Sequence, residues 1–203
     1  MTNDPPQHAD LSTVIAILAG GEGRRLGGID KATVELGGWR LVDVAIARAK
    51  RWRSPVVISA RRPAPWHAAL DVPVVLDDAG HAGPLAGICA VMSWAPVNVA
   101  CLVSLTVDCP FLPDDLVARL TNASLDGSIA VAESGGVRHH LIAAWPRTTW
   151  SAIRSAVQSG VTAVHKAQAG QRTIAVNWPL SPIDPFFNVN TPSDLDGAEE
   201  ISR

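Results

Sequence analysis

The sequence predicts an α/β protein of three layers, with a doubly wound, mostly parallel β-sheet between two layers of helices. Short apolar runs rich in Val and Ile, typical of strands buried on both faces, recur along the chain. Between them lie stretches whose apolar residues repeat with helical spacing. Strands and helices that alternate in this way usually build a parallel sheet covered on both faces. Residues 13–203 are therefore predicted to form a single domain of this class.

The first half of the chain contains three predicted strands and two predicted helices. The run 13–18 is β-branched and ends at Gly20, as a strand that leads into a ligand-binding loop would. Residues 41–52 have helical spacing and carry Arg and Lys toward their end, where the helix dipole favours cations. Strands are predicted at 55–60 and 72–77. A helix is predicted over 85–94, because Pro84 suits its first turn.

The second half continues the alternation. A buried strand is predicted at 100–105. The next helix is predicted to open at Pro113-Asp114-Asp115, whose acids complement the positive end of the helix dipole. Short strands follow at 128–132 and 140–145, and a helix lies near 150–159. Because no internal repeat, low-complexity tract or linker divides the chain, one domain is expected.

Composition and charge exclude several classes of protein. The 203 residues are 47% apolar with a formal net charge of −2, which allows a real core but gives no basic field to attract nucleic acid. The three cysteines form no CxxC pair, which argues against a secreted disulfide framework and a zinc site. Residues 1–12 are predicted to be a disordered tail with no signal peptide, and no apolar run is long enough for a membrane helix. A cytoplasmic protein is expected.

The segment that leaves the first strand, LAGGEGRRLGGIDKA, has the composition of a phosphate-binding loop. Five glycines lie between positions 20 and 28, and Lys31 follows them. Glycines let backbone amides approach a triphosphate, while Arg24, Arg25 and Lys31 can offset its charge. A GxGxxG dinucleotide motif would need glycine at Leu26, and a P-loop would need lysine at Ile29, so both are excluded. The segment is predicted to hold a nucleoside triphosphate, and the alternative is a flexible turn without a ligand.

A single carboxylate, Asp108, stands just beyond the predicted strand 100–105. A carboxylate next to a buried strand is costly unless it is paired or holds a metal. Mg²⁺ is usually bound by one or two carboxylates together with substrate phosphates. Asp108 is therefore predicted to be the magnesium ligand, and the alternative is a cap for the turn before Pro110.

These motifs, with several later ones, resemble those of molybdenum cofactor guanylyltransferases. The matching residues are Leu18-Ala19-Gly20-Gly21, Arg24-Arg25, Leu26-Gly27-Gly28, Asp30-Lys31, Gly83-Pro84-Leu85-Ala86-Gly87, Asp108, Asn188-Val189-Asn190-Thr191-Pro192 and Asp194-Leu195. The resemblance spans residues 13–195 and implies the Rossmann-like nucleotidyltransferase fold. It also implies a magnesium-dependent transfer of GMP from GTP to the terminal phosphate of molybdopterin, with release of pyrophosphate.

The resemblance assigns roles to single positions. The nucleotide-binding residues would be Leu18, Ala19, Gly20, Gly21, Lys31, Asp77 and Asp108, the first four through backbone atoms. The catalytic residues would be Lys31, Asp108 and Arg25, with Mg²⁺ on Asp108, and the acceptor would contact His139, Asn188 and Asn190. Gly21 favours guanine, because relatives that prefer cytidine typically have alanine there. Because adjacent strand residues point to opposite faces, at most one of His139 and His140 is expected to face the site, and His139 is preferred.

Some positions depart from the family pattern. Cys109 follows the metal aspartate instead of preceding it, and His140 stands where many relatives have proline. An arginine usual near 161–164, where it could meet the pterin phosphate, is absent, and the strand between Gly170 and Pro185 has no clear landmark. The sequence therefore leaves two alternatives open. One is a cytidylyltransferase or another nucleotidyltransferase with a different phosphorylated acceptor, and the other is a non-catalytic GTP-binding adaptor. Molybdoenzymes or cofactor-insertion proteins are the protein partners that the resemblance implies.

Overall fold

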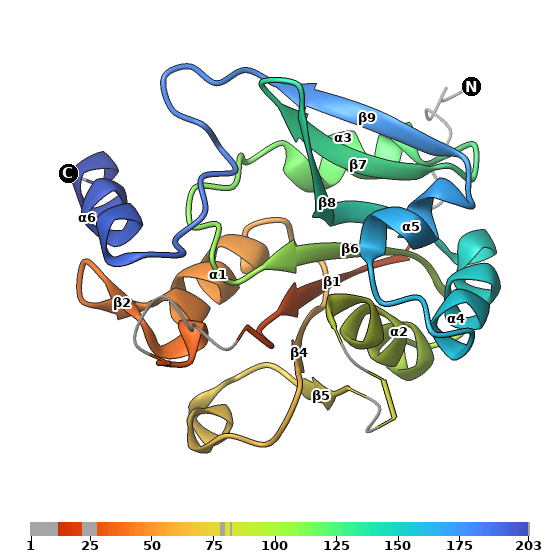
Figure 1. Ribbon diagram of the computed structural model, residues 1–203, viewed down its shortest axis with the longest axis horizontal. Coiled ribbons are helices and arrows are strands. Elements are labelled where there is room, and N and C mark those ends of the chain that lie inside the picture. The colour runs from red at the N-terminus through yellow and green to blue at the C-terminus, as the bar shows by residue number, and fades with distance from the viewer. Residues whose placement is uncertain (1–11, 22–27, 78–79, 82, 203) are drawn as a thin grey trace, which may run out of the picture.

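The computed structural model describes residues 12–21, 28–77, 80–81 and 83–202, and within them a seven-stranded sheet forms the centre of the molecule (Figure 1). The strands lie in the order β5-β4-β1-β6-β8-β7-β9. Their bounds are β1 Ser12–Leu18, β4 Val56–Ala60, β5 Val74–Leu76, β6 Val99–Thr106, β7 Ile129–Ser134, β8 Val137–Pro146 and β9 Thr173–Trp178. β8 runs antiparallel to β6 and β7, and the other pairings are parallel. The predicted mostly parallel sheet is confirmed.

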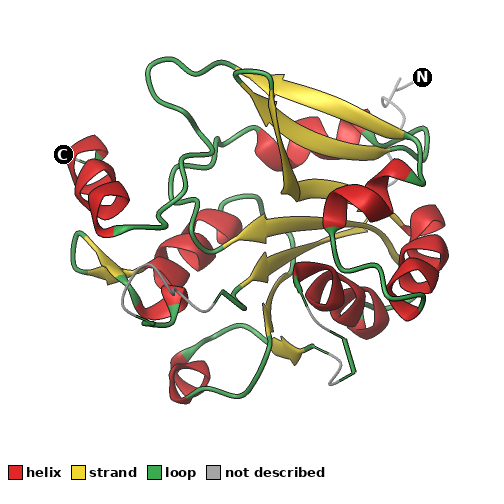
Figure 2. Ribbon diagram, viewed as in Figure 1, coloured by secondary structure: helices red, strands yellow, loops and turns green. Residues whose placement is uncertain are grey.

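Helices cover both faces of this sheet (Figure 2). Their bounds are α1 Leu41–Lys50, α2 Pro84–Trp94, α3 Leu116–Ala123, α4 Trp150–Gln158, α5 Val164–Ala169 and α6 Pro192–Ile201. Alternate residues of β1 enter different cores, because strand side chains alternate between faces. Ile15 and Ile17 pack with α1, α3 and α6, whereas Val14 and Ala16 pack with α2, α4 and α5. This arrangement is the predicted three-layer, doubly wound fold.

Every predicted strand and helix is present, with shifted ends. The helix predicted over 41–52 ends at Lys50, and Arg53 has a φ of 55°, which a right-handed helix cannot accommodate. The helix predicted to open at Pro113 begins instead at Leu116, so that prediction was wrong by three residues. Its two acids have other partners: Asp114 pairs with Arg48, and Asp115 accepts a hydrogen bond from the Trp178 indole.

Several short elements were not predicted. They are the hairpin of β2 Glu35–Leu36 and β3 Trp39–Arg40, the 3₁₀ turns at Lys31–Thr33, Pro65–Ala69 and Arg147–Thr149, and the elements α5, β9 and α6. Most of them are too short to show a clear apolar period, and β9 lies where the sequence has no landmark. The ten residues of α6 include only one buried residue, Ala198, so this helix lacks a strong apolar pattern. Both α5 and α6 nevertheless contribute to the site described below.

β1 begins at Ser12, one residue before the predicted start of the domain, and the rest of the predicted tail lies outside the described residues. In the part of the chain that the structure describes, no helix has the length and apolar character needed to cross a membrane.

Candidate active site

A pocket of about 540 Å³ opens at the carboxyl ends of four parallel strands. Gly20, Arg61, Asp77 and Asp108 follow β1, β4, β5 and β6, and all four residues line it. Parallel strands place their carboxyl ends along one edge of a sheet, which is where open α/β folds bind ligands. β8 runs the opposite way, so the beginning of this strand, rather than its end, reaches the same edge. The pocket therefore has a wall from the parallel strands and a wall from β8.

A lysine and an aspartate form an ion pair in this pocket. The Nζ atom of Lys31 lies 2.6 Å from Oδ2 of Asp108, and the two side chains are only 13% and 16% exposed. The same ammonium contacts Oδ1 of Asn190. The stem of Lys31 packs along Gly21, since a Cβ at this glycine would be in ordinary van der Waals contact with the lysine, 3.4 Å from its Cδ. Three segments far apart in sequence thus meet around one ammonium group.

Asp108 is held by a second residue of the C-terminal motif. With its amide nitrogen facing the carboxylate, Asn188 lies 2.8 Å and 3.3 Å from the two Asp108 oxygens. The backbone N–H of Val189 donates to the Asp108 carbonyl at 2.9 Å, which joins this motif to the end of β6. The Asn188 amide thus orients the Asp108 carboxylate, and both residues line the pocket.

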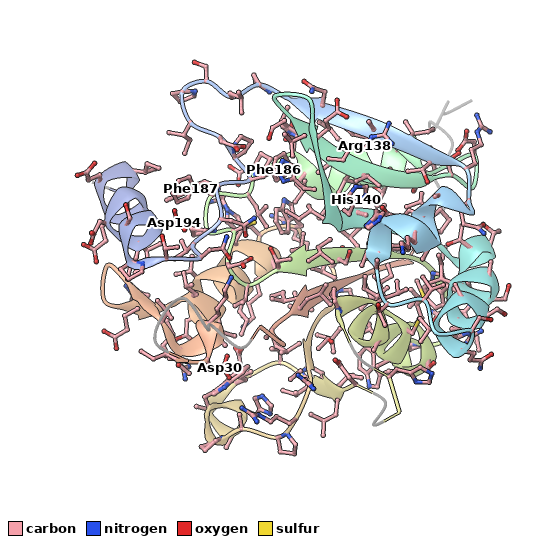
Figure 3. The ribbon with its side chains drawn as sticks, viewed as in Figure 1. Asp30, Arg138, His140, Phe186, Phe187 and Asp194 are labelled. Atoms are coloured by element: carbon pink, nitrogen blue, oxygen red, sulfur yellow. The ribbon has the colours of Figure 1, made fainter. Side chains whose placement is uncertain are left out.

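The position of Asn190 depends on the first turn of α6. Thr191 caps this helix, with its hydroxyl accepting from the backbone N–H of Asp194 at 3.2 Å. The Asp194 carboxylate in turn accepts from the N–H groups of Asn190 and Thr191, at 2.9 Å and 2.8 Å. This reciprocal arrangement is a capping box, and it fixes the backbone that carries Asn190. Figure 3 labels Asp194 at the start of α6.

Replacement of Asp194 by alanine is expected to lower the free energy of unfolding by about 1 kcal/mol, the usual cost of a lost helix cap. The backbone N–H of Asn190 lowers the pKa of Asp194, so folding favours the ionised carboxylate. This stabilisation is present above the unfolded aspartate pKa of about 3.9 and is lost as the pH falls through the lower folded value. Denaturant titrations from neutral to acidic pH should therefore show the two proteins converging. A stability gap that stays constant with pH would contradict this account.

A small acidic recess lies beyond β4 and β5. The buried Ser59 hydroxyl donates to Oδ1 of Asp77 at 3.0 Å. Gly87 of α2 lies directly against this pair, since a Cβ at this glycine would come within 2.2 Å of the Ser59 Oγ and 3.0 Å of the Asp77 Oδ1. The close approach of α2 thus requires glycine at this position, and it leaves the Asp77 carboxylate facing the pocket.

The wall formed by β8 carries two histidines with different partners. His139 lies 2.8 Å from the Ser134 hydroxyl, which donates to Asp184 at 2.9 Å, and its ring packs on Phe186. Burial is the main cause that lowers the pKa of His139. His140 instead contacts Gln168 of α5.

Both histidines belong to the lining of the pocket, which includes residues 138–142 of β8 and therefore backbone as well as side chains. The expectation that at most one of the two rings faces the site stays a prediction. The partners of the two rings lie on different elements, as expected of adjacent strand residues. However, the pairing of β7 with β8 shifts register between Val131 and Ala132. This irregularity departs from the regular alternation on which the prediction relied.

Comparison with known proteins assigns the chain to a family. Residues 15–173 match the MobA-like NTP transferase domain. A molybdenum cofactor guanylyltransferase of Bradyrhizobium sp. (strain ORS 278) is 40% identical over 193 residues, which cover 92% of this chain and 91% of the relative. Another, from Acidiphilium cryptum (strain JF-5), is 43% identical over 200 residues and 96% of both chains. This chain belongs to the molybdenum cofactor guanylyltransferase family.

Solved structures place the fold of this guanylyltransferase family member among nucleotidyltransferases. Molybdopterin-guanine dinucleotide biosynthesis protein A from Archaeoglobus fulgidus is similar with a TM-score of 0.77 and 24% identity, over 93% of this chain and 98% of that one. A 2-C-methyl-D-erythritol 4-phosphate cytidylyltransferase from Thermus thermophilus gives 0.70 and 17%, with the same coverage. The predicted Rossmann-like nucleotidyltransferase fold and the nucleotidyltransferase class are confirmed.

The pocket of this family member brings together most residues singled out from the sequence. Those that line it are Leu18, Gly20, Gly21, Lys31, Asp77, Asp108, His139, Asn188 and Asn190. Ala19 does not line it, and lines instead an adjoining hollow shared with Gly20 and Gly21. Arg25 lies outside the described residues. The roles of all these residues remain predictions.

The sequence prediction missed Ser59, Arg61, Arg138 and His140, which also line the pocket. Ser59 and Arg61 lie at the end of a strand that was predicted correctly, so the rule that ligands bind at strand ends could have found them. Arg138 and His140 carry no such signal, because nothing in the sequence shows that β8 is antiparallel.

Proposed function

We propose that this chain transfers GMP from GTP to the terminal phosphate of molybdopterin, giving a guanine dinucleotide and pyrophosphate. The observation that carries the proposal is the convergence of Lys31, Asp108 and Asn190 at one pocket, in a chain of this family. A protein that bound GTP without catalysis would not need the Asp108 carboxylate, a candidate magnesium ligand, next to the Gly-rich loop that ends at Lys31.

The nucleotide would occupy the side of the pocket formed by β1, β4, β5 and the start of α2. Gly20 and Gly21 would let backbone atoms approach the base and ribose. Asp77 is suited to guanine, because a carboxylate accepts two hydrogen bonds and guanine presents N1–H and an amino group along one edge. Lys31, together with Arg25, would meet the phosphates.

Asp108 is the residue that would hold Mg²⁺. Among the described residues no group of three or more His, Cys, Asp or Glu side chains could hold a metal ion, so substrate phosphates would have to supply further ligands. The donor set fits, since the ammonium of Lys31 already lies 2.6 Å from the carboxylate as a stand-in cation. A bound Mg²⁺ would neutralise charge on the triphosphate.

In the proposed reaction an oxygen of the acceptor's terminal phosphate attacks the α-phosphorus of GTP. A new P–O bond forms, the bond from the α-phosphorus to the bridging oxygen breaks, and pyrophosphate leaves with the electron pair. Lys31 would stabilise the charge on the phosphates, and such positioned cations supply much of the catalysis in phosphoryl transfer.

A covalent enzyme intermediate is not part of the proposed reaction. Cys109 lines the pocket next to Asp108, but burial raises the pKa of its thiol, and the Asp108 charge raises it further. A thiol that stays protonated is a poor nucleophile.

The acceptor would occupy the side of the pocket formed by β8 and the C-terminal motif. Arg138 lies on this wall, paired with Glu133 at 3.5 Å and about half exposed. We assign Arg138 as a cation for the acceptor phosphate, since the arginine usual near 161–164 in the family is absent. His139, Asn188 and Asn190 would contact the rest of the acceptor, and the reaction would take place in the cytoplasm.

Pyrophosphate release tests this proposal. GTP, CTP and ATP are each supplied with Mg²⁺, with and without molybdopterin. Release is expected only with GTP and molybdopterin together. Asp77→Asn should raise the KM for GTP by about 10- to 100-fold, because a lost hydrogen bond to a charged group costs about 1.5–3 kcal/mol.

The control for this experiment is Asp71→Asn, because Asp71 has an exposed carboxylate that pairs with Lys50 outside the pocket. Its KM for GTP should match that of the wild type. Equal release from CTP would contradict the guanine assignment, and GTP binding without turnover would favour the adaptor alternative.

A further inference from the structure

Gln168 is a buried polar residue that the proposed reaction does not use. It lies on α5, and its residue exposure is 2%. Neighbouring residues of this short helix, Val164 and Ala167, are part of the apolar core. A buried amide is costly unless its hydrogen bonds are made, so the partners of Gln168 show what it does.

Both polar atoms of the Gln168 side chain bind the same residue, His140. Nε2 of the amide donates to the main-chain carbonyl of His140 at 3.0 Å. Oε1 lies 2.6 Å from Nδ1 of the His140 ring. Figure 3 labels His140 on β8, where this strand meets α5. The amide therefore holds both the backbone and the ring of a residue that lines the pocket.

These two contacts fix the position of a proton. A carbonyl oxygen only accepts hydrogen bonds, so the atom facing it must be the NH₂ of Gln168, and the atom facing the ring must be the amide oxygen. Because an amide oxygen also only accepts, Nδ1 of His140 must carry a proton. The neutral ring then has its lone pair on Nε2, and no partner for Nε2 is present in the described part of the chain.

The neighbouring histidine is held with the opposite nitrogen protonated. The Ser134 hydroxyl uses its one proton to donate to the Asp184 carboxylate at 2.9 Å, so it can only accept from Nε2–H of His139 at 2.8 Å. The lone pair of the neutral His139 ring is therefore on Nδ1. Each ring on this wall has one nitrogen fixed as a donor to the protein, which leaves the other as an acceptor.

We propose that Gln168 is a positioning residue that holds His140 with Nδ1 protonated, so that Nε2 accepts a hydrogen bond from an N–H group of the acceptor's heterocycle. This inference rests on the proposed function, because it places the acceptor against β8. A pterin ring is rich in N–H donors, and a site built to accept a hydrogen bond discriminates strongly against ligands that lack the donor. The phosphate of the acceptor would be met by Arg138, two residues earlier on the same strand.

The test compares Gln168→Met with the wild type. Methionine has a similar shape but cannot hold the amide hydrogen bonds. The KM for molybdopterin is expected to rise about tenfold, while kcat and the KM for GTP stay within about twofold of the wild type. Gln171→Met is the matched control, since the side-chain amide of Gln171 donates to the adjacent Gly170 carbonyl, and the kinetic constants of this variant should not change.

Ring-nitrogen NMR gives a readout that packing alone would not change. At mildly alkaline pH, wild-type His140 should carry its proton on Nδ1. In Gln168→Met this preference should be lost. In Gln168→Glu, a second variant of the same length, the carboxylate should favour a ring protonated on both nitrogens and again raise the KM for molybdopterin.

Two results would overturn the inference: a wild-type ring with its proton on Nε2, or an unchanged KM for molybdopterin in a variant whose ring protonation has changed. Failure of the proposed function would look different. In that case the wild type would not turn over GTP with molybdopterin, although the NMR signals would still report the Gln168–His140 contact.

Discussion

Replacement of Asp108 by asparagine is expected to lower kcat by ~10²–10³-fold, the typical loss when one charge-stabilising group is removed from such a site. The amide keeps the size of the side chain but removes the negative charge that would hold Mg²⁺ and that pairs with Lys31. Turnover should be measured by pyrophosphate release over a range of Mg²⁺ concentrations. The variant should need more Mg²⁺ for half-maximal rate.

The matched control for this variant is Asp114→Asn. Asp114 is an exposed carboxylate that pairs with Arg48 and Arg51, and surface pairs contribute only about 0–1 kcal/mol. Its kcat and magnesium dependence should equal those of the wild type. If Asp108→Asn kept wild-type turnover in a folded protein, Asp108 could not be the metal ligand.

Gly87→Ala is expected to weaken GTP binding about tenfold or more. The added methyl would lie 2.2 Å from the Ser59 Oγ and 3.0 Å from the Asp77 Oδ1, so the hydroxyl must turn away and release Asp77. Overpacking of this kind usually lowers the free energy of unfolding by about 1–3 kcal/mol. A displaced Asp77 would also lose its hydrogen bond to GTP, which is worth about 1.5–3 kcal/mol for a charged group, and each 1.4 kcal/mol is tenfold in Kd. Isothermal titration with a non-hydrolysable GTP analogue would measure the change.

The double variant Gly87→Ala/Ser59→Ala separates crowding from other effects of the substitution. Without the hydroxyl, the nearest Ser59 atom to the new methyl would be its Cβ at 3.4 Å, which is tolerable with a small shift. The double variant should therefore bind GTP better than Gly87→Ala alone, a non-additive result expected only of residues in contact. Strictly additive losses would show that the close approach of α2 does not control the Asp77 carboxylate.

Much of the fold could be predicted because buried parallel strands have a strong sequence signal. The runs at 13–18 and 100–105 are continuous and apolar, and they become β1 and β6 at the centre of the sheet. The direction of β8 could not be predicted, because residues 140–145 have the same apolar character whether the strand runs parallel or antiparallel. The start of α3 was misplaced by three residues, because Asp114 pairs with Arg48 and Asp115 accepts a hydrogen bond from the Trp178 indole.

Some residues of the candidate site could likewise be predicted from the sequence, and others could not. Lys31 and Asp108 follow strands that were identified from their pattern, so their meeting in one pocket follows from the topology. Asn188 and Asn190 were found only through the family resemblance, since their segment has no periodic pattern. Gln168 could not be found at all, because its role depends on the packing of α5 against β8 and on hydrogen bonds between residues 28 positions apart.

The most direct test of the central claim, that GMP moves straight from GTP to the acceptor in this pocket, is a label-transfer measurement. GTP carrying radioactive phosphorus at the α-phosphate is mixed with the wild-type protein, Mg²⁺ and molybdopterin, and the products are separated from the protein. We predict that the label appears in the dinucleotide product, with none retained on denatured protein, and that Asp108→Asn transfers it ~10²–10³-fold more slowly. Label bound covalently to the protein, or label that stays in GTP while the protein is folded and molybdopterin is present, would contradict the account.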